Sequence, residues 1–252
     1  MVHAFVANSG HMPLLLNSLK SIHRLPTPWK SLVFALDTKI CSDLRQLSSK
    51  IDISCIPYAP RMLQQMKQDE PIFYQECINK TGQEISLHES ASWGSDMHKV
   101  LINSKLYALR DSLNCGLDVF LTDVDVAFLK DPRPYFDGGE DIIAQNDTNP
   151  VNYKLNINSG FMYWRHTQQN LNLSQALVKE TVWSYFDQTR VNELLWERRV
   201  NATILNTTQF PNGFSLWGLT TLNDTIAVHV NWNENLDQKI QRLMKHDLWL
   251  ID

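Results

Sequence analysis

Strong charge of one sign and long hydrophobic runs are both lacking in this 252-residue chain. It carries 23 basic against 27 acidic residues, and no basic run is longer than Arg198-Arg199. Because a nucleic-acid surface needs clustered positive charge, nucleic acid is excluded as the expected partner. No apolar stretch approaches the ~20 residues that cross a bilayer. We therefore expect no membrane span within the chain.

Signal-peptide features and cysteine pairs are also missing. Residues Met1–Asn8 lack the basic start and long apolar centre of a signal peptide, so we expect any signal or anchor to lie upstream. The cysteines Cys41, Cys55, Cys77 and Cys115 show none of the short paired spacings of zinc sites. They are expected to be structural thiols or to form up to two disulfides, and the sequence does not choose between these.

Asn-x-Ser/Thr sequons are abundant and indicate a compartment. They begin at Asn79, Asn146, Asn172, Asn201, Asn206 and Asn223. Their number exceeds the chance expectation for a chain of this composition, which favours a Golgi or other secretory lumen. If Met1 is the native start, a cytoplasmic location is expected instead.

Strand and helix patterns alternate at the start of the chain. An apolar strand signal over Val2–Val6 is followed by the turn Asn8-Ser-Gly10 and by an apolar helical face from Leu14 to Ile22. The pattern continues with a strand over Ser31–Leu36, a helix over Ser42–Lys50 and a strand over Ile51–Ile56. This alternation predicts an α/β fold with a mostly parallel central sheet flanked by helices, with ligands at the carboxyl ends of its strands.

The middle of the chain is less regular. Residues Pro57–Ser95 are polar and without clear periodicity, and we expect a long functional loop there. Helical spacing from Met97 to Leu113 then leads into a strand over Val119–Thr122, and a last helix is expected over Leu236–Lys245. With 43% apolar residues, the chain is predicted to form one domain over residues 1–252.

Two carboxylates stand between apolar runs. Asp123 and Asp125 follow Val119–Thr122 and precede Val126–Leu129. If the strand continues, side chains at i and i+2 point the same way, so both carboxylates reach one hard cation. An Asp-x-Asp motif is common in solvated turns, but two like charges at a buried strand end repel and need a cation to be stable there. The flanks therefore favour a metal site.

Ordered motifs extend over nearly the whole chain. They are the opening Val6-Ala-Asn-Ser-Gly-His-Met-Pro-Leu14, Lys105, the run from Gly116 to Pro132, Asn158-Ser-Gly-Phe161, Asp187-Gln188 with Asn192, His229-Val-Asn-Trp232, Lys239 and Leu248-Trp249. In these motifs the chain resembles the nucleotide-diphospho-sugar transferases of glycosyltransferase family 77, which include plant xylosyl- and arabinosyltransferases. The resemblance implies a GT-A fold and a retaining transfer from a UDP-sugar with a divalent cation, commonly manganese. It also implies a nucleotide-sugar-binding half over residues 1–135 and an acceptor and active-site half over residues 136–252.

The same resemblance implies that Asp123, Asp125 and His229 share the metal. Two carboxylates and an imidazole suit a manganese-like ion, and a diphosphate would complete its shell. Taken in isolation, His229 would instead be interpreted as a buried histidine hydrogen-bonded between strands.

Three further residues are expected to bind the donor. Lys239 lies on the last helix, where an ammonium group can bind the departing diphosphate, although a solvated lysine is the alternative. Lys105 matches a basic residue before the metal strand, and Lys99 and Arg110 are its rivals. Asn8 follows the first strand, where folds of this type bind the base, or it simply shapes the turn.

Three residues are candidates for catalysis. Asn158 has an amide that can bond phosphate or sugar oxygens, although Asn158-Ser-Gly160 also fits an ordinary turn. Asp187 is a plausible helix cap. The resemblance implies that Asp187 holds sugar hydroxyls and that Gln188 lies near the anomeric carbon. Because a carboxamide is a poor nucleophile, we favour attack by the acceptor on the face that the diphosphate leaves.

Two other functions fit parts of the sequence. Haloacid-dehalogenase-type phosphatases also place Asp-x-Asp after a strand, but their motif continues with Thr or Val where Ala127 stands, and it usually lies on the first strand. An inactive nucleotide- or glycan-binding module is the second alternative. UDP-xylose, UDP-galactose and UDP-arabinose all fit as donors to a glycan or glycoprotein acceptor, and Trp164, Trp217 and Trp232 are candidates for stacking against acceptor sugars.

Overall fold

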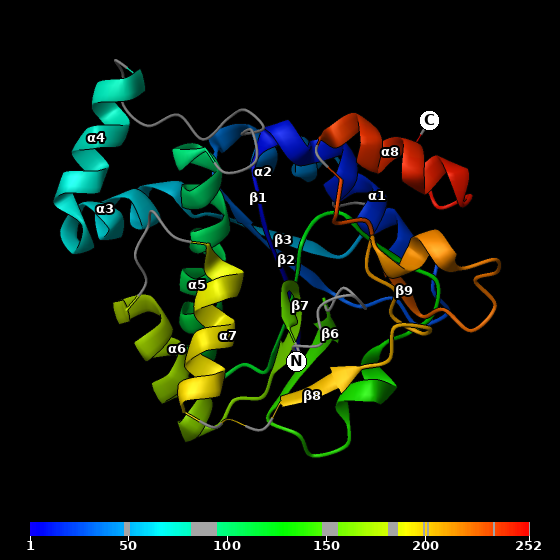
Figure 1. Ribbon diagram of the computed structural model, residues 1–252. Helices are drawn as coiled ribbons and strands as arrows, with labels where there is room; N and C mark the ends of the chain where they lie inside the picture. Colours follow the sequence, from blue (N-terminus) through cyan, green and yellow to red (C-terminus); the bar gives the residue numbers. More distant parts are fainter. Residues whose placement is uncertain are drawn as a thin grey trace.

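The computed structural model describes residues 1–47, 51–81, 95–147, 156–180, 186–198, 200, 202–233 and 235–251. Its strands are β1 (Val2–Ala7), β2 (Ser31–Ala35), β3 (Ile53–Pro57), β4 (Val119–Thr122), β5 (Val126–Phe128), β6 (Ile142–Asn146), β7 (Ile157–Trp164), β8 (Ala202–Leu205) and β9 (Ala227–His229). Seven of them form one sheet in the order β3-β2-β1-β4-β7-β6-β8 (Figure 1). The remaining pair, β5 and β9, forms an antiparallel ribbon.

The sheet is mostly parallel. Strands β3, β2, β1 and β4 run parallel to one another, and β6 runs parallel to β8. Only β7 is antiparallel to both neighbours, with Thr122 of β4 opposite Phe161. This reversal brings the amino end of β7 to the edge where β4 ends. The predicted α/β class is confirmed.

Helices cover both faces of the sheet. Their bounds are α1 (Met12–His23), α2 (Thr38–Leu47), α3 (Ala59–Asp69), α4 (Pro71–Thr81), α5 (Asp96–Asn114), α6 (Gln168–Glu180), α7 (Asp187–Glu197) and α8 (Leu236–Lys245), with short 3₁₀ turns η1 (Ser9–His11), η2 (Arg133–Phe136) and η3 (Ser215–Gly218). Helices α3 to α7 pack on the face that includes Leu121 and Met162. Helices α1 and α2 pack on the face that includes Phe120 and Phe161, since neighbouring strand residues point to opposite sides. Helix α8 packs on the β5–β9 ribbon through Leu243.

The predicted loop over Pro57–Ser95 is wrong for its first part. Helices α3 and α4 occupy residues 59–81, and residues 82–94 lie outside the described residues. Each helix has a proline in its first turn, where the missing N–H costs nothing, and buries a pair of side chains four residues apart, Met62 with Met66 and Phe73 with Cys77. These short apolar stripes are hidden among polar residues, which explains the error.

Other predicted elements agree more closely. The strand over Val119–Thr122 and the helix over Leu236–Lys245 have the predicted bounds. The helix predicted over Ser42–Lys50 starts earlier, at Thr38, and residues 48–50 lie outside the described residues.

One disulfide is present, between Cys41 on α2 and Cys55 on β3. Cys77 is a buried thiol outside any disulfide, and Cys115 is an exposed one. Of the alternatives left open by the sequence, the structure therefore has one disulfide and two thiols. Among the described helices, none combines the length and apolar character that crossing a bilayer requires.

Candidate active site

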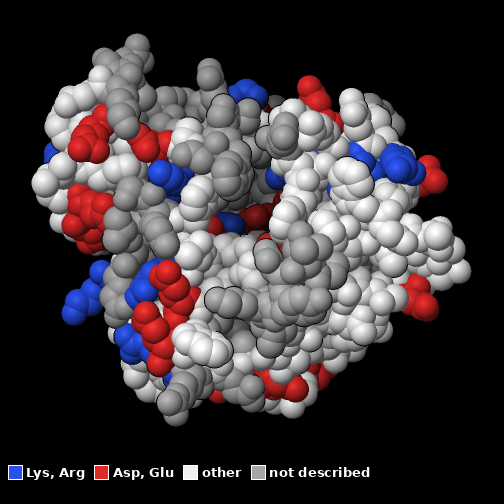
Figure 2. Space-filling model, in the orientation of Figure 1, with Lys and Arg blue, Asp and Glu red and all other residues white. Residues whose placement is uncertain are grey.

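A cavity of about 810 Å³ opens at the edge of the sheet where β4 ends and β7 begins. A smaller cavity of about 120 Å³ adjoins it, toward the end of β1. Lys105, Asp123, Asp125 and Lys239 line both. The space-filling view shows this face hollowed near its centre, with acidic and basic atoms side by side in the hollow (Figure 2). Each site residue predicted from the sequence lines at least one of the two cavities.

Asp123 and Asp125 lie in the turn between β4 and β5, so they do not continue the strand as expected. Two backbone hydrogen bonds hold the turn. The N–H of Asp123 donates to the Gly160 oxygen at 2.8 Å, and the N–H of Val230 donates to the Asp125 oxygen at 3.1 Å. The ribbon pairs Val126 with His229, which brings the histidine beside both carboxylates. Two short paired strands thus bring His229 next to Asp123 and Asp125, although about a hundred residues separate them in the sequence.

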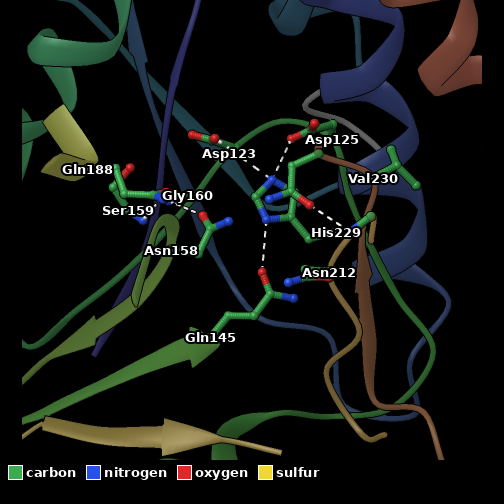
Figure 3. Close-up of polar contacts among 12 residues, drawn as sticks. Asp123, Asp125, Gln145, Asn158, Ser159, Gly160, Gln188, Asn212, His229 and Val230 are labelled. Atoms are coloured by element: carbon green, nitrogen blue, oxygen red, sulfur yellow. Dashed lines mark hydrogen bonds and ion pairs between the residues drawn. The ribbon is translucent and has the colours of Figure 1, made fainter. Parts of the chain in front are cut away.

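The two carboxylates and the imidazole can hold one cation. One ligand atom from each of Asp123, Asp125 and His229 lies within 4.8 Å of the others. The His229 Nε2 is 3.1 Å from Asp125 Oδ1 and 3.8 Å from Asp123 Oδ2 (Figure 3). These separations suit a hard cation between the three groups.

The other ring nitrogen of His229 fixes its tautomer. Gln145 on β6 donates its amide N–H groups to the backbone oxygens of Phe210 and Pro211, both at 3.1 Å. The Gln145 Oε1 must therefore accept, and it lies 3.0 Å from His229 Nδ1. With the proton on Nδ1, the Nε2 lone pair faces two carboxylates. A metal cation placed between them removes that repulsion, so the donor set fits a divalent ion.

Gly160 on β7 leaves the space for this centre. A Cβ atom at this position would lie 2.3 Å from Asp123 Oδ2 and 2.8 Å from His229 Cε1. Backbone can approach the two ligands this closely only without a side chain. The glycine of the Asn158-Ser-Gly160 motif is therefore explained by its packing against Asp123 and His229.

Lys105 on α5 forms ion pairs with Asp123 in the turn after β4 and with Asp187 on α7. Its ammonium group is 2.8 Å from Asp123 Oδ1 and 3.0 Å from Asp187 Oδ2, and the side chain is buried. Burial lowers the pKa of Lys105, but the two carboxylates outweigh it and raise that pKa above its usual value. Lys99 and Arg110, the alternatives to Lys105 in the sequence, line neither cavity and so do not enter the site.

Lys239 on α8 pairs with Asp125, with 2.8 Å between Nζ and Oδ2. Burial lowers the pKa of Lys239, but Asp125 outweighs it and raises that pKa. Burial likewise acts to raise the pKa of Asp125, but the Lys239 ammonium group beside it holds that pKa well below its usual range. Asp125 is therefore ionised and Lys239 charged, and the ammonium group contacts Oδ2 of Asp125 while Oδ1 faces His229 Nε2.

The amide groups of the site converge on Asp147, just after β6. Its carboxylate accepts from Asn158 Nδ2 at 3.0 Å, Gln188 Nε2 at 2.9 Å, Asn231 Nδ2 at 2.8 Å and Trp232 Nε1 at 3.0 Å. A buried carboxylate with so many donors is well satisfied without a cation. Asp147 therefore fixes the orientation of four side chains that line the large cavity.

Two local expectations are corrected. Asn158-Ser-Gly160 is part of β7 and not a turn, and the Asn158 Oδ1 accepts from the Gly160 N–H at 2.7 Å. Asp187 is the first residue of α7, and Phe186 occupies the cap position. Asp187 thereby points its carboxylate at Lys105, while Gln188 also accepts from the Ser159 N–H at 3.2 Å.

Asn8 lies at the end of β1 and lines the small cavity. Its side-chain oxygen is 2.7 Å from His11 Nδ1, and its backbone oxygen accepts from the His11 N–H at 3.1 Å. The residue thus both shapes the turn and faces the cavity. Of the tryptophan candidates, Trp164 is fully buried and is wrong as a stacking residue, whereas Trp232 lines the large cavity.

Several site residues were not identified from the sequence: Gln145, Asp147, Asn212, Asn231 and His11. One signal was available, because Gln145 and Asp147 end the apolar run Ile142–Ala144 as Asp123 ends its own strand. The contribution of Asn212, which donates to the Asn146 oxygen at 2.9 Å, comes from a long loop and has no such pattern.

Comparisons with known proteins identify the family and the fold. Residues 71–243 match the family described as nucleotide-diphospho-sugar transferase. Beta-arabinofuranosyltransferase RAY1 of Arabidopsis thaliana is 25% identical in an alignment of 218 positions that covers 73% of this chain and 40% of the relative. A UDP-D-xylose:L-fucose alpha-1,3-D-xylosyltransferase of the same plant is 26% identical in an alignment of 170 positions that covers 56% of this chain and 46% of the relative. The chain thus spans less than half the length of these relatives.

Solved structures share the fold. The apo-form glycosyltransferase GlyE of Streptococcus pneumoniae has a TM-score of 0.58 at 12% identity, over 100% of this chain and 60% of that one. Mouse xyloside xylosyltransferase 1 has a TM-score of 0.58 at 12% identity, and the match covers 93% of this chain and 98% of that one. The galactosyltransferase LgtC, solved with donor and acceptor sugar analogues, has a TM-score of 0.53 at 12% identity, and the match covers 98% of this chain and 96% of that one. The fold is the predicted GT-A type, and the match over well more than half of the sequence shows that this chain belongs to the nucleotide-diphospho-sugar transferase family.

Proposed function

We propose that this chain transfers a sugar from a UDP-sugar to a glycan or glycoprotein acceptor, with retention at the anomeric carbon and with a divalent cation such as Mn²⁺. The observation that carries the proposal is the Nε2 lone pair of His229, which faces Asp123 and Asp125 at the floor of a cavity large enough for a nucleotide sugar. The names of the plant relatives, which include a UDP-D-xylose-dependent transferase, support the donor class.

The cation would be held by Asp123, Asp125 and His229, with Gln145 orienting the histidine. When bound, it supplies positive charge to the diphosphate of the donor. Manganese is our choice because carboxylate and imidazole ligands suit it.

The diphosphate also needs charge from the protein. Lys239 keeps its proton because its pKa is raised, and it lines both cavities. With a cation held at Asp125, the Lys239 ammonium group would be available to the departing diphosphate. Asn8 would contact the base in the small cavity, and Lys105 a phosphate or the donor sugar. Residues 1–135 then bind mainly the nucleotide sugar and residues 136–252 complete the active site and take the acceptor.

Asn158, Asp187 and Gln188 would surround the donor sugar. In the reaction the bond from the anomeric carbon to the diphosphate oxygen breaks, and a bond to the acceptor hydroxyl oxygen forms on the same face. The hydroxyl proton passes to a diphosphate oxygen, so UDP and the new glycoside are the products. Gln188 is bonded through both ends of its amide to Asp147 and to Ser159, which holds it rigidly beside the sugar and suits positioning better than nucleophilic attack.

A donor screen tests the proposal. UDP-xylose, UDP-galactose and UDP-arabinose are each added with MnCl₂ or with EDTA, and unfolding temperature and sugar release are measured. A donor present at 100 times its dissociation constant is expected to stabilise the fold by ~2.7 kcal/mol, which is a shift of several degrees. No stabilisation and no sugar release with any UDP-sugar would overturn the proposal. UDP binding without sugar release or transfer would favour the inactive binding module instead.

The phosphatase alternative is disfavoured by topology, because the Asp-x-Asp segment follows β4 and not the first strand. Loss of phosphate from simple phosphate esters, without sugar transfer, would restore it.

We further propose a Golgi or secretory location. The Cys41–Cys55 disulfide is typical of oxidising compartments, and Asn79, Asn172, Asn206 and Asn223 are exposed enough to accept a glycan. The sequon at Asn201 lies outside the described residues. Expression in a secretory host should give a product that loses mass on treatment with an N-glycosidase, and an unmodified product would contradict this.

A further inference from the structure

Trp232 follows the metal-binding strand and lines the large cavity with half of its surface uncovered. Its exposed fraction is 49%, although the side chain contacts other site residues. The indole N–H donates to Asp147 Oδ1 at 3.0 Å, and the ring meets Phe214 edge-on at 5.8 Å between centroids. One edge of the indole is therefore fixed while ring surface remains open to the cavity.

The backbone of Trp232 is held in a conformation that bulky residues rarely adopt. Its φ is +59°, in the left-handed region that favours glycine. Both neighbours keep it there. Asn233 donates to the Val230 and Asn231 oxygens at 2.8 and 3.0 Å, and the Asn231 side-chain oxygen accepts from the Gly213 N–H at 2.6 Å. Such a cost is tolerated mainly where it directs a group toward a ligand.

Within the described part of the chain, the other exposed tryptophans differ in their surroundings. Trp196 is 85% exposed on α7 and lines no cavity described above, and Trp217 is 71% exposed but has the Arg242 guanidinium 4.1 Å above its ring. Only Trp232 of these three combines an open ring with a hydrogen bond into the site. Because Asp147 also binds Asn158 and Gln188, the ring has a fixed relation to the residues around the reacting carbon.

We propose that Trp232 is the platform on which a neutral sugar ring of the acceptor stacks. This rests on the proposed sugar transfer. One face of a pyranose ring carries C–H groups and packs against an indole, while its hydroxyls lie at the edge, where Gln188 and Thr189 line the same cavity. Asp147 is then a positioning residue that sets the angle of the platform. The acceptor class that follows is a glycan with an uncharged terminal sugar.

Trp232→Gly is the informative variant, because it removes the ring and relieves the left-handed backbone at once. Its unfolding temperature should not fall by more than a few degrees. Release of sugar from the donor to water is measured beside transfer to methyl glycosides of neutral monosaccharides, with Mn²⁺ present. We expect the ratio of transfer to hydrolysis to fall roughly tenfold or more, through a higher KM for the glycoside. Trp196→Ala is the matched control and should keep the wild-type ratio.

The outcomes separate this inference from the proposed function. If the wild type hydrolyses no UDP-sugar, the proposed transfer fails. If the wild type does hydrolyse a UDP-sugar, the platform is overturned by a ratio within twofold of wild type in Trp232→Gly, or by an equal loss of hydrolysis and transfer. It is also overturned if no neutral glycoside accepts the sugar. Trp232→Phe, which keeps a ring but loses the N–H donor to Asp147, should lie between wild type and Trp232→Gly in the same assay.

Discussion

Two buried histidines on strands occupy very different regions of this molecule. His3 on β1 and His229 on β9 are each 1% exposed, and each stands among apolar residues in the sequence. His3 lies among aromatic rings, with Phe5 at 4.3 Å and Phe120 at 4.7 Å between centroids. His229 meets two carboxylates. The local sequence hardly distinguishes the two histidines. They differ in the side chains that the fold places next to each ring.

Hydrogen bonding sharpens the contrast. The indole N–H of Trp29 donates to His3 Nδ1 at 3.0 Å, so that nitrogen carries no proton, and His3 Nε2 is paired with the Thr122 hydroxyl at 2.8 Å. Both ring nitrogens of His3 are satisfied within a neutral environment. In His229 the Gln145 partner puts the proton on Nδ1 and directs a lone pair toward negative charge. The His3 ring packs as part of the aromatic core, whereas the arrangement around His229 suits a bound cation.

The largest effect is expected from Asp125→Asn, which keeps the shape of the side chain but removes its charge from the cation site. We expect turnover of the UDP-sugar to fall ~10³-fold, the magnitude typical of losing a main electrostatic contact to the transition state. Steady-state assays with saturating Mn²⁺ measure it, and circular dichroism checks the fold. Asp131→Asn, on the surface beside Arg133, is the control and should keep wild-type turnover. Full activity of Asp125→Asn would show that the site is wrongly drawn.

Lys239→Met should separate metal binding from charge stabilisation. The ammonium group lies 2.8 Å from Asp125 Oδ2, so its positive charge would compete with a cation bound at the same carboxylate. We expect turnover to fall about 10²-fold, while Mn²⁺ binds at least as tightly as in wild type, as measured by calorimetry. The control Lys245→Met removes an exposed lysine from the end of the same helix. Weaker Mn²⁺ binding in Lys239→Met would contradict the competition.

Gln145→Leu removes the group that orients His229 and leaves the three metal ligands unchanged. Partners of this kind typically contribute 10–100-fold to metal affinity, and we expect a loss of about tenfold in Mn²⁺ affinity with a smaller loss of turnover at saturating metal. A titration followed by activity measures both. Gln168→Leu, on the exposed side of α6, is the control. Unchanged affinity in Gln145→Leu would mean that His229 is held by its strand alone.

Which parts of the site could be predicted from the sequence depends on which contacts are local in the chain. Asp123, Asp125 and the strand before them could be predicted because the apolar run and the acids are adjacent in sequence, and family resemblance added His229, Lys239 and Gln188. The apolar run before Asp147 was a signal for a polar strand end, but the role of Asp147 could not be predicted, since its donors come from β7, α7 and the loop after β9 and meet only in the folded chain. The helices after Pro57 were missed because only two side chains of each are buried and these stand among polar residues.

The smallest effect on turnover is expected at His3, where a change should alter pH-dependent stability instead. Burial lowers the pKa of His3 from 6.5 to about 3. Because the unfolded chain binds the proton near pH 6.5 and the folded chain does not, stability from the neutral ring is complete above pH 6.5 and is lost as the pH falls toward 3. Between pH 7 and pH 5 the loss amounts to about 2 kcal/mol.

His3→Gln keeps an acceptor for Trp29 without titrating, so its unfolding free energy should fall by about 2 kcal/mol less than that of the wild type over the same range. Urea unfolding at both pH values measures the difference, and equal losses in the two proteins would mean that His3 gains no stability from being neutral. At pH 7 turnover should be that of the wild type, because His3 lies in the aromatic core and lines neither cavity.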